Sequence, residues 1–584
     1  MYQVTDPWTV GKGRLRWRDR IEARLAGLSR QQVRLIVAPW RPVSGGAEQG
    51  HGLLAGRLVF GDARAKAKPG TPLWQVAAPT PEFEAARHGF VWLDDLAAAG
   101  TPEAYRTGRE WLADWMTRFG RGRGPGWTLA ETSCRLGAVI RHAAWLSSGP
   151  DGLAPERLER FFARHRRFAM NRFQTMPEGL VQFELCANLI LAGCALDMSE
   201  RLRSAAQAVL EQACRDWIRP DGTLPNRCPE ALARVLHHLA LAAEVLSDTD
   251  HQLRPQHRQA LTCIPAAVRG LRHNDGGLAR FHGGGAGNCA QIDAALSVIG
   301  RKGQRTSDRP MGLVRLVRGH TSIISDCAAP PAGRDAGAFG HASTLAFEAT
   351  IGRHPLIVNC GAGARFGADW RRASRNTPSH STLTLDGQSS SRFGKARRDG
   401  EDLIEGPGDI QCDVWASGLA AQLVAAHNGY AESYGLIHAR RLELSAQGTA
   451  LQGEDMLSAV TEIERRQFAH RQGLLSTGRG VPFAVRFHLH PAVRGMVDPD
   501  LDRVLLTLPN NEVWVFGHRS DCTIRLDPSV YLENTDPEPR ATQQIVLEGL
   551  ASRPETLVRW SLTQEVGAPP NRRDVQPDDK TDPA

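Results

Sequence analysis

The spacing of apolar residues changes once along this 584-residue chain. From about Thr128 to His273, apolar residues recur every three or four positions, in blocks separated by Gly, Pro and Asp. One block begins at Pro229, and its apolar residues from Leu232 to Leu246 fall on one helical face; proline suits a first helical position. The pattern predicts consecutive helix pairs with short connections.

After about Arg305 the apolar period becomes two. Val485 and Phe487 face one way while Arg486 and His488 face the other, which predicts a half-buried strand. Turn signals recur between such segments, as expected for an antiparallel sandwich. We therefore expect a multidomain α+β protein whose helical and β halves divide within residues 300–314.

Four parts of the chain follow from these patterns. The alternation over residues 53–60 predicts short strands or a hairpin within residues 1–110. Residues 111–305 are predicted to form a helical domain and residues 306–565 a β-sandwich. Residues 566–584 are rich in Pro, Asp and Arg, so a disordered tail is expected there.

Composition narrows the class of protein. Hydrophobic residues make up 41% of the chain and charged residues 23%, which is typical of globular proteins. No apolar run approaches the roughly 20 residues of a membrane span, and no apolar signal segment begins the chain, so a cytoplasmic location is expected. The net charge of +8 favours acidic partners. Because Walker, zinc-finger and RNA-binding aromatic motifs are lacking, we do not expect nucleic acid among them.

Three segments in the β half carry a family resemblance. Residues 340–348 read GHASTLAFE, residues 356–361 read LIVNCG, and residues 379–387 read SHSTLTLDG. Together with later motifs such as RFHLHP at 486–491, they resemble the heparinase II/III family of polysaccharide lyases. The resemblance implies an incomplete (α/α) toroid followed by an antiparallel β-sandwich. It also implies β-elimination on an acidic, uronate-containing polysaccharide.

The resemblance assigns roles to residues of the sandwich. His341 matches the family's cleft histidine and is the leading catalytic candidate, as base or carboxylate partner. His380 matches a second position and is predicted to bind substrate; orienting the site, binding a metal and a structural role are the alternatives. Tyr430 and His438 are predicted to support catalysis, and the Arg440 guanidinium suits a carboxylate or sulfate group. A sheet surface held together by hydrogen bonds is the alternative for these last three residues.

The helical half departs from the family pattern. Leu180 and Val181 stand where an Asn-His pair is expected to neutralise the uronate carboxylate, and Glu230 stands where a catalytic Tyr is expected. Neither apolar side chain can donate a hydrogen bond to a carboxylate.

Three polar residues of the helical half remain as substrate-binding candidates. Asn226 and Arg227 are the obvious donors in the turn before Pro229, although such residues also cap helices without further function. Arg272 precedes a Gly-rich stretch that we expect to line the cleft, and His341 and these residues are expected to surround a basic groove between the two domains. Two interpretations stay open: a lyase, or a glycan-binding protein that has lost the chemistry.

Metal binding and location also bear on the resemblance. Some family members hold a structural divalent metal, but Ser343 and Asn359, both weak ligands, stand near two of its ligand positions. His488 and His490 have a spacing that can chelate zinc, yet a solvated face is the more common reason for such a pair. We therefore predict no metal, with structural zinc or calcium as the alternative.

The family resemblance adds the periplasm or cell envelope as an alternative location.

Overall fold

A computed structural model describes residues 16–37, 45–60, 63–300, 308–333, 336–395, 401–474, 480–498, 500–533 and 538–565. The predicted tail, 566–584, lies outside the described residues. The chain divides into two compact units, each built from several stretches of sequence. The helical unit comprises Met1–Ile218, Arg234–Thr262 and Ala290–Lys302. The strand-rich unit comprises Arg219–Ala233, Cys263–Cys289 and Gly303–Ala584.

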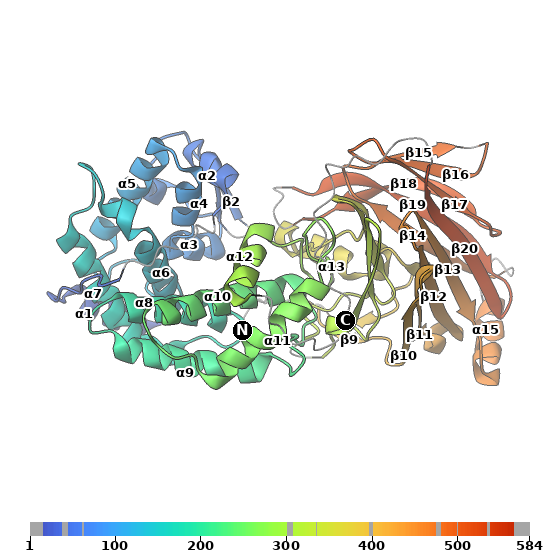
Figure 1. Ribbon diagram of the computed structural model, residues 1–584, viewed down its shortest axis with the longest axis horizontal. Coiled ribbons are helices and arrows are strands. Elements are labelled where there is room, and N and C mark those ends of the chain that lie inside the picture. The colour runs from blue at the N-terminus through green and yellow to red at the C-terminus, as the bar shows by residue number, and fades with distance from the viewer. Residues whose placement is uncertain are drawn as a thin grey trace. The chain divides into compact units, whose positions relative to one another are not determined.

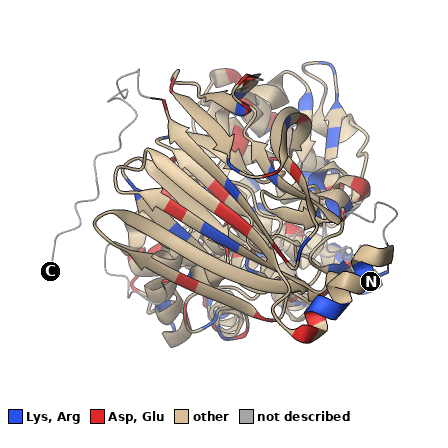
Figure 2. Ribbon diagram, turned by 90° about the vertical axis from the view of Figure 1, so that its right-hand side faces the viewer, with Lys and Arg blue, Asp and Glu red and all other residues tan. Residues whose placement is uncertain are grey.

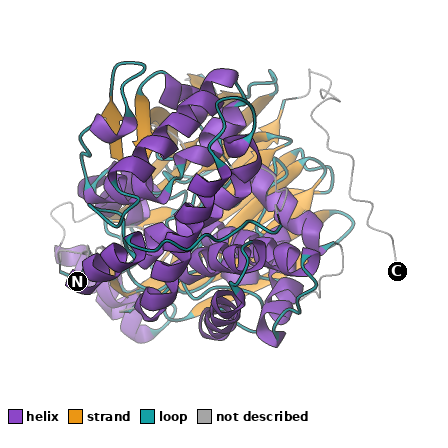
Figure 3. Cartoon of the chain, turned by 90° about the vertical axis from the view of Figure 1, so that its left-hand side faces the viewer, coloured by secondary structure: helices purple, strands orange, loops and turns teal. Residues whose placement is uncertain are grey.

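Helices account for most of the described residues before residue 300 (Figures 1 and 3). They are α1 (Trp17–Gly27), α2 (Ala47–Leu54), η1 (Leu73–Gln75), α3 (Pro81–Gly89), α4 (Trp92–Ala99), α5 (Pro102–Arg118), α6 (Leu129–Ser147), α7 (Pro155–Arg172), η2 (Phe173–Thr175), α8 (Val181–Ala195), α9 (Glu200–Trp217), α10 (Pro229–Asp248), α11 (Pro255–Gly270) and α12 (Cys289–Ile299). None of the helices in the described ranges combines the length and apolar character that crossing a bilayer requires.

Local sequence explains where these helices begin. The Thr128 hydroxyl accepts from the Glu131 amide at 3.4 Å, and the Glu131 carboxylate accepts from the Thr128 amide at 3.2 Å, which forms a capping box for α6. Helix α10 begins at Pro229, as predicted. Proline has no backbone N–H, and in the first turn of a helix this group would have no intrahelical partner, so nothing is lost there. Helix α8 packs against α6 and α9, so it is buried nearly all round.

The first 110 residues are more helical than predicted. Strands β1 (Arg57–Phe60) and β2 (Ala63–Lys66) pair in antiparallel register, which agrees with the expected hairpin. Leu53 and Leu54, however, belong to α2 rather than to the strand. Alternation over so few residues does not separate a strand from the end of an amphipathic helix.

Two antiparallel sheets form the sandwich of the strand-rich unit (Figure 1). The first runs in the order β10 (Ile410–Ala416), β11 (Ala420–Tyr430), β12 (Leu436–Ser445), β13 (Ala450–Ser458), β20 (Glu555–Gln564), β17 (Val513–His518), β16 (Arg503–Thr507), β15 (Arg494–Asp498). The second runs in the order β18 (Thr523–Tyr531), β19 (Arg540–Ala551), β14 (Val481–Leu489), β6 (His354–Val358), β5 (Phe347–Ile351), β4 (Thr321–Asp326), β3 (Leu313–Arg318), with β7 (Leu383–Leu385) also on β14. The predicted fold class, helices followed by an antiparallel sandwich, is confirmed.

Shorter elements join the strands of this unit. They are η3 (Pro310–Gly312), η4 (Ala364–Phe366), α13 (Ala368–Arg375), η5 (Thr377–Ser379), α14 (Ala431–Tyr434), α15 (Glu462–Leu474) and the small pair β8 (Arg392–Phe393) and β9 (Leu403–Glu405).

An aromatic cluster fills the space between the two sheets. The Trp560 ring stacks on Phe347 at 5.7 Å and on Phe516 at 5.8 Å, and meets Phe487 edge-on at 4.7 Å. Gly453 faces Trp560 across the β13–β20 pair, and a Cβ there would lie 2.0 Å from the indole. The glycine therefore makes room for the largest ring of the core.

The predicted half-exposed face of β14 is wrong at His488. This residue is only 2% exposed. Its Nε2 lies 3.0 Å from the Pro378 carbonyl oxygen and its Nδ1 lies 2.8 Å from the Ser529 hydroxyl. The segment after α13 covers this end of the strand, and alternation along β14 alone gives no sign of that cover.

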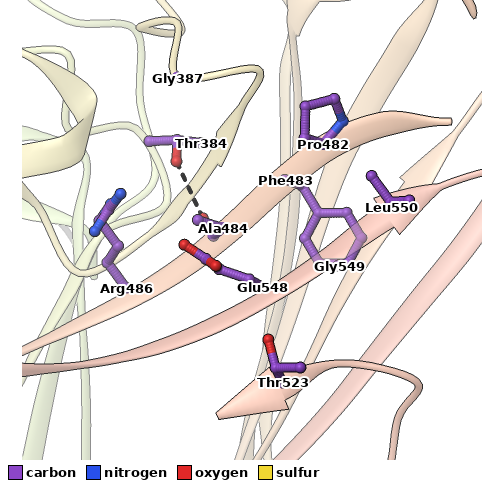
Figure 4. A pocket seen from close by; sticks show the side chains of 10 residues that line it. All are labelled: Thr384, Gly387, Pro482, Phe483, Ala484, Arg486, Thr523, Glu548, Gly549 and Leu550. Atoms are coloured by element: carbon purple, nitrogen blue, oxygen red, sulfur yellow. Dashed lines mark hydrogen bonds between the residues drawn. The ribbon is translucent and has the colours of Figure 1, made fainter. Parts of the chain in front are cut away.

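The solvent faces of the two sheets differ. On the first sheet, positively and negatively charged residues occur near one another along the strands (Figure 2), and Arg559 pairs with Glu454 at 3.0 Å. Exposed pairs of this kind contribute little to stability. The second sheet borders a pocket of about 440 Å³, beside which the largely buried Phe483 ring lies over Gly549 (Figure 4). A Cβ at Gly549 would approach that ring to 2.6 Å.

Candidate functional site

Two of the predicted residues, His341 and His380, meet inside the strand-rich unit. His341 lies between β4 and β5, and His380 directly follows η5. Nδ1 of His341 is 3.2 Å from Nε2 of His380, and the ring centroids are 5.3 Å apart. The side chains are 5% and 2% exposed, respectively. The sequence-predicted pair is therefore a buried contact.

The hydrogen bonds define which ring nitrogens carry protons. Nδ1 of His380 is 2.9 Å from the Asn376 carbonyl oxygen, which can only accept, so this nitrogen carries a hydrogen. Neutral His380 then accepts at Nε2 from the Nδ1–H of His341. The lone pair of His341 is left on its Nε2, which has no hydrogen-bond partner among the described residues. That nitrogen faces Gly283, where a Cβ would lie 3.9 Å away.

Both histidines are neutral at physiological pH. Burial lowers the pKa of His380 to about 4. Burial, followed by the charges of His380 and Arg375, holds the pKa of His341 well below its usual range. Nε2 of His341 therefore carries a lone pair that can accept a proton, and the contact with His380 fixes its orientation.

A buried ion pair lies behind His341. The His341 amide donates to Nδ1 of His282 at 3.3 Å, so Nε2 of His282 carries its proton and faces Asp326 at 3.3 Å. Asp326 is paired with Arg227 and accepts from the Ser343 hydroxyl at 2.7 Å. Burial alone would raise the pKa of Asp326, but Arg227 and His282 hold it well below its usual range.

Backbone strain gathers around this ion pair. Positive φ angles, which residues other than glycine rarely adopt, occur at Arg227 (53°), His282 (49°), Met311 (58°) and Leu345 (63°). The Met311 carbonyl accepts from Nε of Arg227 at 2.6 Å. Each such residue costs on the order of 1–3 kcal/mol, which the surrounding contacts must offset, and such strain is frequent at functional sites.

The three substrate-binding candidates that the sequence analysis placed in the helical half belong to the strand-rich unit, where they occupy different settings. Asn226 closes a local turn by accepting from the Cys228 amide at 3.2 Å. Arg272 donates to the Gly276 carbonyl at 2.7 Å. Arg227 alone joins the network behind His341, where Asp326 and backbone carbonyls occupy its guanidinium.

Tyr430 is placed in the packed interior of the sandwich. It is 1% exposed, and its hydroxyl donates to the Leu383 carbonyl at 3.0 Å. Burial raises the pKa of Tyr430 above its usual value. Proton transfer to a bound substrate would therefore require both exposure and the loss of this hydrogen bond.

His438 and Arg440 are likewise interior and share one carboxylate. Nε2 of His438 lies 2.8 Å from Oδ1 of Asp455, and Nε of Arg440 donates to the same oxygen at 2.8 Å. Nη1 of Arg440 donates to the carbonyls of Leu345 and Ser381, both at 2.8 Å. Arg440 therefore joins the two loops that carry His341 and His380, and its contacts are those of a positioning residue.

His282 and Asp326 belong to the site but were not among the predicted residues. His282 stands directly before the glycines that begin at Gly283, and Asp326 ends a strand that is buried on both faces. A buried carboxylate needs a cationic partner, but the strand reads TSIISD, and its mixture of polar and apolar residues does not mark it as buried in the sequence. The sequence does not say that the partner is Arg227.

The residues near the family's metal positions do not fit a metal ion. The Ser343 hydroxyl donates to Asp326, and the Asn359 amide group donates to Glu348 at 3.3 Å while its oxygen accepts from Ser381 at 3.0 Å. Both nitrogens of His488 are engaged by protein oxygens. Within the ranges that the structure describes, no group of three or more His, Cys, Asp or Glu residues has a metal-binding arrangement.

From the lowered pKa values of two buried histidines, we predict how the free energy of unfolding depends on pH. The pKa of His380 is lowered to about 4 and that of His488 to about 3, both by burial, against about 6.5 in the unfolded chain. Between these values the unfolded state binds more protons, so the free energy of unfolding should fall as pH falls below 6.5. Each histidine contributes up to about 1.4 kcal/mol per pH unit.

Urea unfolding at pH 7.5, 6.5 and 5.5 measures this dependence. The unfolding midpoint should drop steeply below pH 6.5, and His380→Gln should flatten the slope because one titrating group is removed. A midpoint that does not change over this range would contradict neutral burial of the two rings.

Comparisons with known proteins agree with this architecture. Residues 302–561 match the family model described as Heparinase II/III-like, C-terminal. FtsZ-localized protein C of Caulobacter vibrioides is 29% identical over 538 residues, which cover 90% of this chain and 89% of that protein.

Solved structures show the same fold over nearly the whole chain. Heparinase III superposes with a TM-score of 0.64 at 13% identity, covering 95% of this chain and 93% of that one. Heparan sulfate lyase HepC from Pedobacter heparinus superposes with a TM-score of 0.55 at 14% identity, covering 94% and 87%. At such identities the likeness establishes the fold alone.

Proposed function

The chain belongs to the heparinase II/III-like family through its C-terminal domain, and from this premise we propose that it is a polysaccharide lyase. Its substrate is an acidic, uronate-containing glycan, and the reaction is a β-elimination. The observation that carries the proposal is the free lone pair on Nε2 of His341, which the hydrogen bonds through His380 to the Asn376 carbonyl orient.

His341 acts as the proton acceptor. Its Nε2 takes the proton from the carbon next to the uronate carboxylate, and the electrons of that C–H bond form a carbon–carbon double bond. The bond from the neighbouring carbon to the glycosidic oxygen breaks, and that oxygen needs a proton as it leaves. Because Tyr430 is buried and hydrogen-bonded, we assign this proton to the imidazolium of His341 itself.

Two arginines supply positive charge near this histidine. Arg375 is held by backbone carbonyls, including that of Gly340 at 2.8 Å, and Arg371 donates to the Ala338 carbonyl at 2.9 Å. Both charges lower the pKa of His341 in the free protein. A bound uronate carboxylate would offset them and raise the pKa of His341 towards neutrality, which would make it a stronger base when substrate is present.

A glycan-binding protein without chemistry is the second candidate, and Glu230 favours it. This residue stands at the family's catalytic Tyr position, and its carboxylate accepts from the Gly285 amide at 2.7 Å. It therefore holds the Gly-rich loop in place rather than a substrate. Leu180 and Val181 at the other altered position are buried and apolar.

An elimination assay separates the two candidates. The full chain is incubated with a panel of uronate polysaccharides, and the unsaturated product is followed by its ultraviolet absorbance. Product from at least one glycan supports the lyase. Salt-sensitive binding of a glycan with no product from any of them would replace the lyase by the binding protein.

The curated relative supports a separate proposal about location. Because the name of that relative describes it as localised with FtsZ, we propose that this protein also gathers where FtsZ does. A fluorescent fusion imaged together with labelled FtsZ tests the proposal. A uniform distribution of the fusion through dividing cells would contradict it.

A further inference from the structure

A cavity of about 440 Å³ in the helical unit is lined by arginines. It lies among the end of α5, the loop that follows, and one face of α7. Arg121 and Arg123 come from the loop, and Arg157, Arg160 and Arg164 come from α7. Their spacing of three and four residues places the three α7 side chains on one face of the helix. None of these residues belongs to the site around His341, which lies in the other unit.

None of the five guanidinium groups has an acidic partner in the part of the chain that the structure describes. Within the ranges that the structure describes, no carboxylate lies within 4.0 Å of any of them, whereas the adjacent Arg118 pairs with Asp114 at 2.6 Å. The side chains of Arg121, Arg123 and Arg160 also make no hydrogen bond with other described residues. Positive charge is therefore concentrated here without neutralisation.

One of the arginines that line the cavity has an unused donor. Nη1 of Arg164 donates to the Gly120 carbonyl at 3.2 Å, while its Nε is buried and has no hydrogen-bond partner among the described residues. Burial and the charges of Arg121 and Arg160 lower the pKa of Arg164. A buried donor without a partner costs free energy that an anion in the cavity would recover.

Repulsion among these charges favours an anionic ligand. An arginine stays protonated in proteins, so the cluster cannot relieve the repulsion by releasing protons. Guanidinium forks bind the oxygens of phosphate, sulfate and carboxylate groups in pairs of hydrogen bonds. The cavity also falls within the range of about 300–1,000 Å³ that is typical of small-molecule sites.

We propose that this cavity binds a small ligand that carries at least two phosphate groups. A phosphate monoester carries a charge of about −1.5 to −2 at neutral pH, so two such groups balance most of the five positive charges. Carboxylates and sulfate esters carry one charge per group and balance fewer in the same volume. The proposal is independent of the elimination chemistry and makes no use of His341.

Titration calorimetry of the full chain with pyrophosphate, at low ionic strength, tests the proposal. We expect one site per chain, and orthophosphate and sulfate should bind at least about 10-fold more weakly. The Arg121→Ala/Arg160→Ala double variant should lose about 10-fold in affinity for each guanidinium removed. Because these two side chains hydrogen-bond to no other described residue, the fold should persist, and circular dichroism checks that it does.

A control variant separates the cavity from general charge. Arg201→Ala/Arg215→Ala removes two exposed arginines from α9 in the same unit, so the net charge changes equally. Its affinity for pyrophosphate should stay within twofold of the unaltered chain. Equal losses in the two double variants, or no binding at millimolar pyrophosphate, would overturn the site. Equal affinity for sulfate and pyrophosphate would overturn the requirement for two phosphate groups.

Discussion

Replacing His341 by alanine is expected to lower turnover of a uronate polysaccharide by about 10²- to 10⁴-fold, the usual contribution of a positioned proton acceptor. The loss follows because Nε2 of His341 has a free lone pair, oriented by its contact with His380. The measurement is the initial rate of unsaturated product at saturating and at low substrate.

Two further variants make this result specific. His341→Gln keeps an N–H donor for His380 and much of the side-chain volume but offers no imidazole, so it should be as inactive as the alanine variant. His320→Ala removes an exposed histidine from the same unit and should keep full activity. Full activity of both His341 variants would show that another group removes the proton.

Replacing Arg227 by methionine is expected to destabilise the strand-rich unit by about 3–5 kcal/mol. The change leaves Asp326, which is fully buried, without its cationic partner, and a buried unpaired charge is costly. The free energy of unfolding is measured by urea denaturation at pH 7. Arg525→Met breaks an exposed pair with Glu548, at 2.7 Å, and should cost less than about 1 kcal/mol.

A double-mutant cycle shows whether the pair itself is responsible. Arg227→Met/Asp326→Asn removes both charges, so it should be less destabilised than the sum of the two single variants. Additive losses would mean that Arg227 stabilises the unit mainly through the carbonyls of Met311 and Ala329 rather than through Asp326.

The fold could be predicted where burial follows a single period. The blocks in α9 and α10 have a repeat near 3.6, and the sequence of β14 alternates over several residues, so these elements could be predicted. The prediction failed where a neighbouring segment changes burial, as at His488, or where the pattern is too short, as at Leu53. The period of apolar residues shows which face of an element packs against the core, but it does not show whether a segment far away in the sequence buries the other face.

The site was predictable only in part for a related reason. His341 and His380 are marked by local motifs, and the structure brings them into contact. The partnership of Arg227 with Asp326 joins residues 99 positions apart, and no local pattern encodes it. Tyr430 and Arg440 have chemistry that suits a substrate, but their burial depends on the packing of two sheets, which only the folded structure reveals.

The strand-rich unit is built from three separate stretches of the chain, and these stretches leave the ribosome at different times. Arg280 leaves the ribosome 253 residues before Glu533, to which its guanidinium donates at 3.2 Å. Glu348, whose carboxylate lies 3.8 Å from the same guanidinium, emerges much earlier. At about 5–20 residues per second, Arg280 therefore has only one of its two carboxylate partners for much of the roughly 10 to 50 s before Glu533 appears. The loop around His282 therefore gains its contact with Glu533 only when the last strands emerge, so the surroundings of His341 are completed late in synthesis.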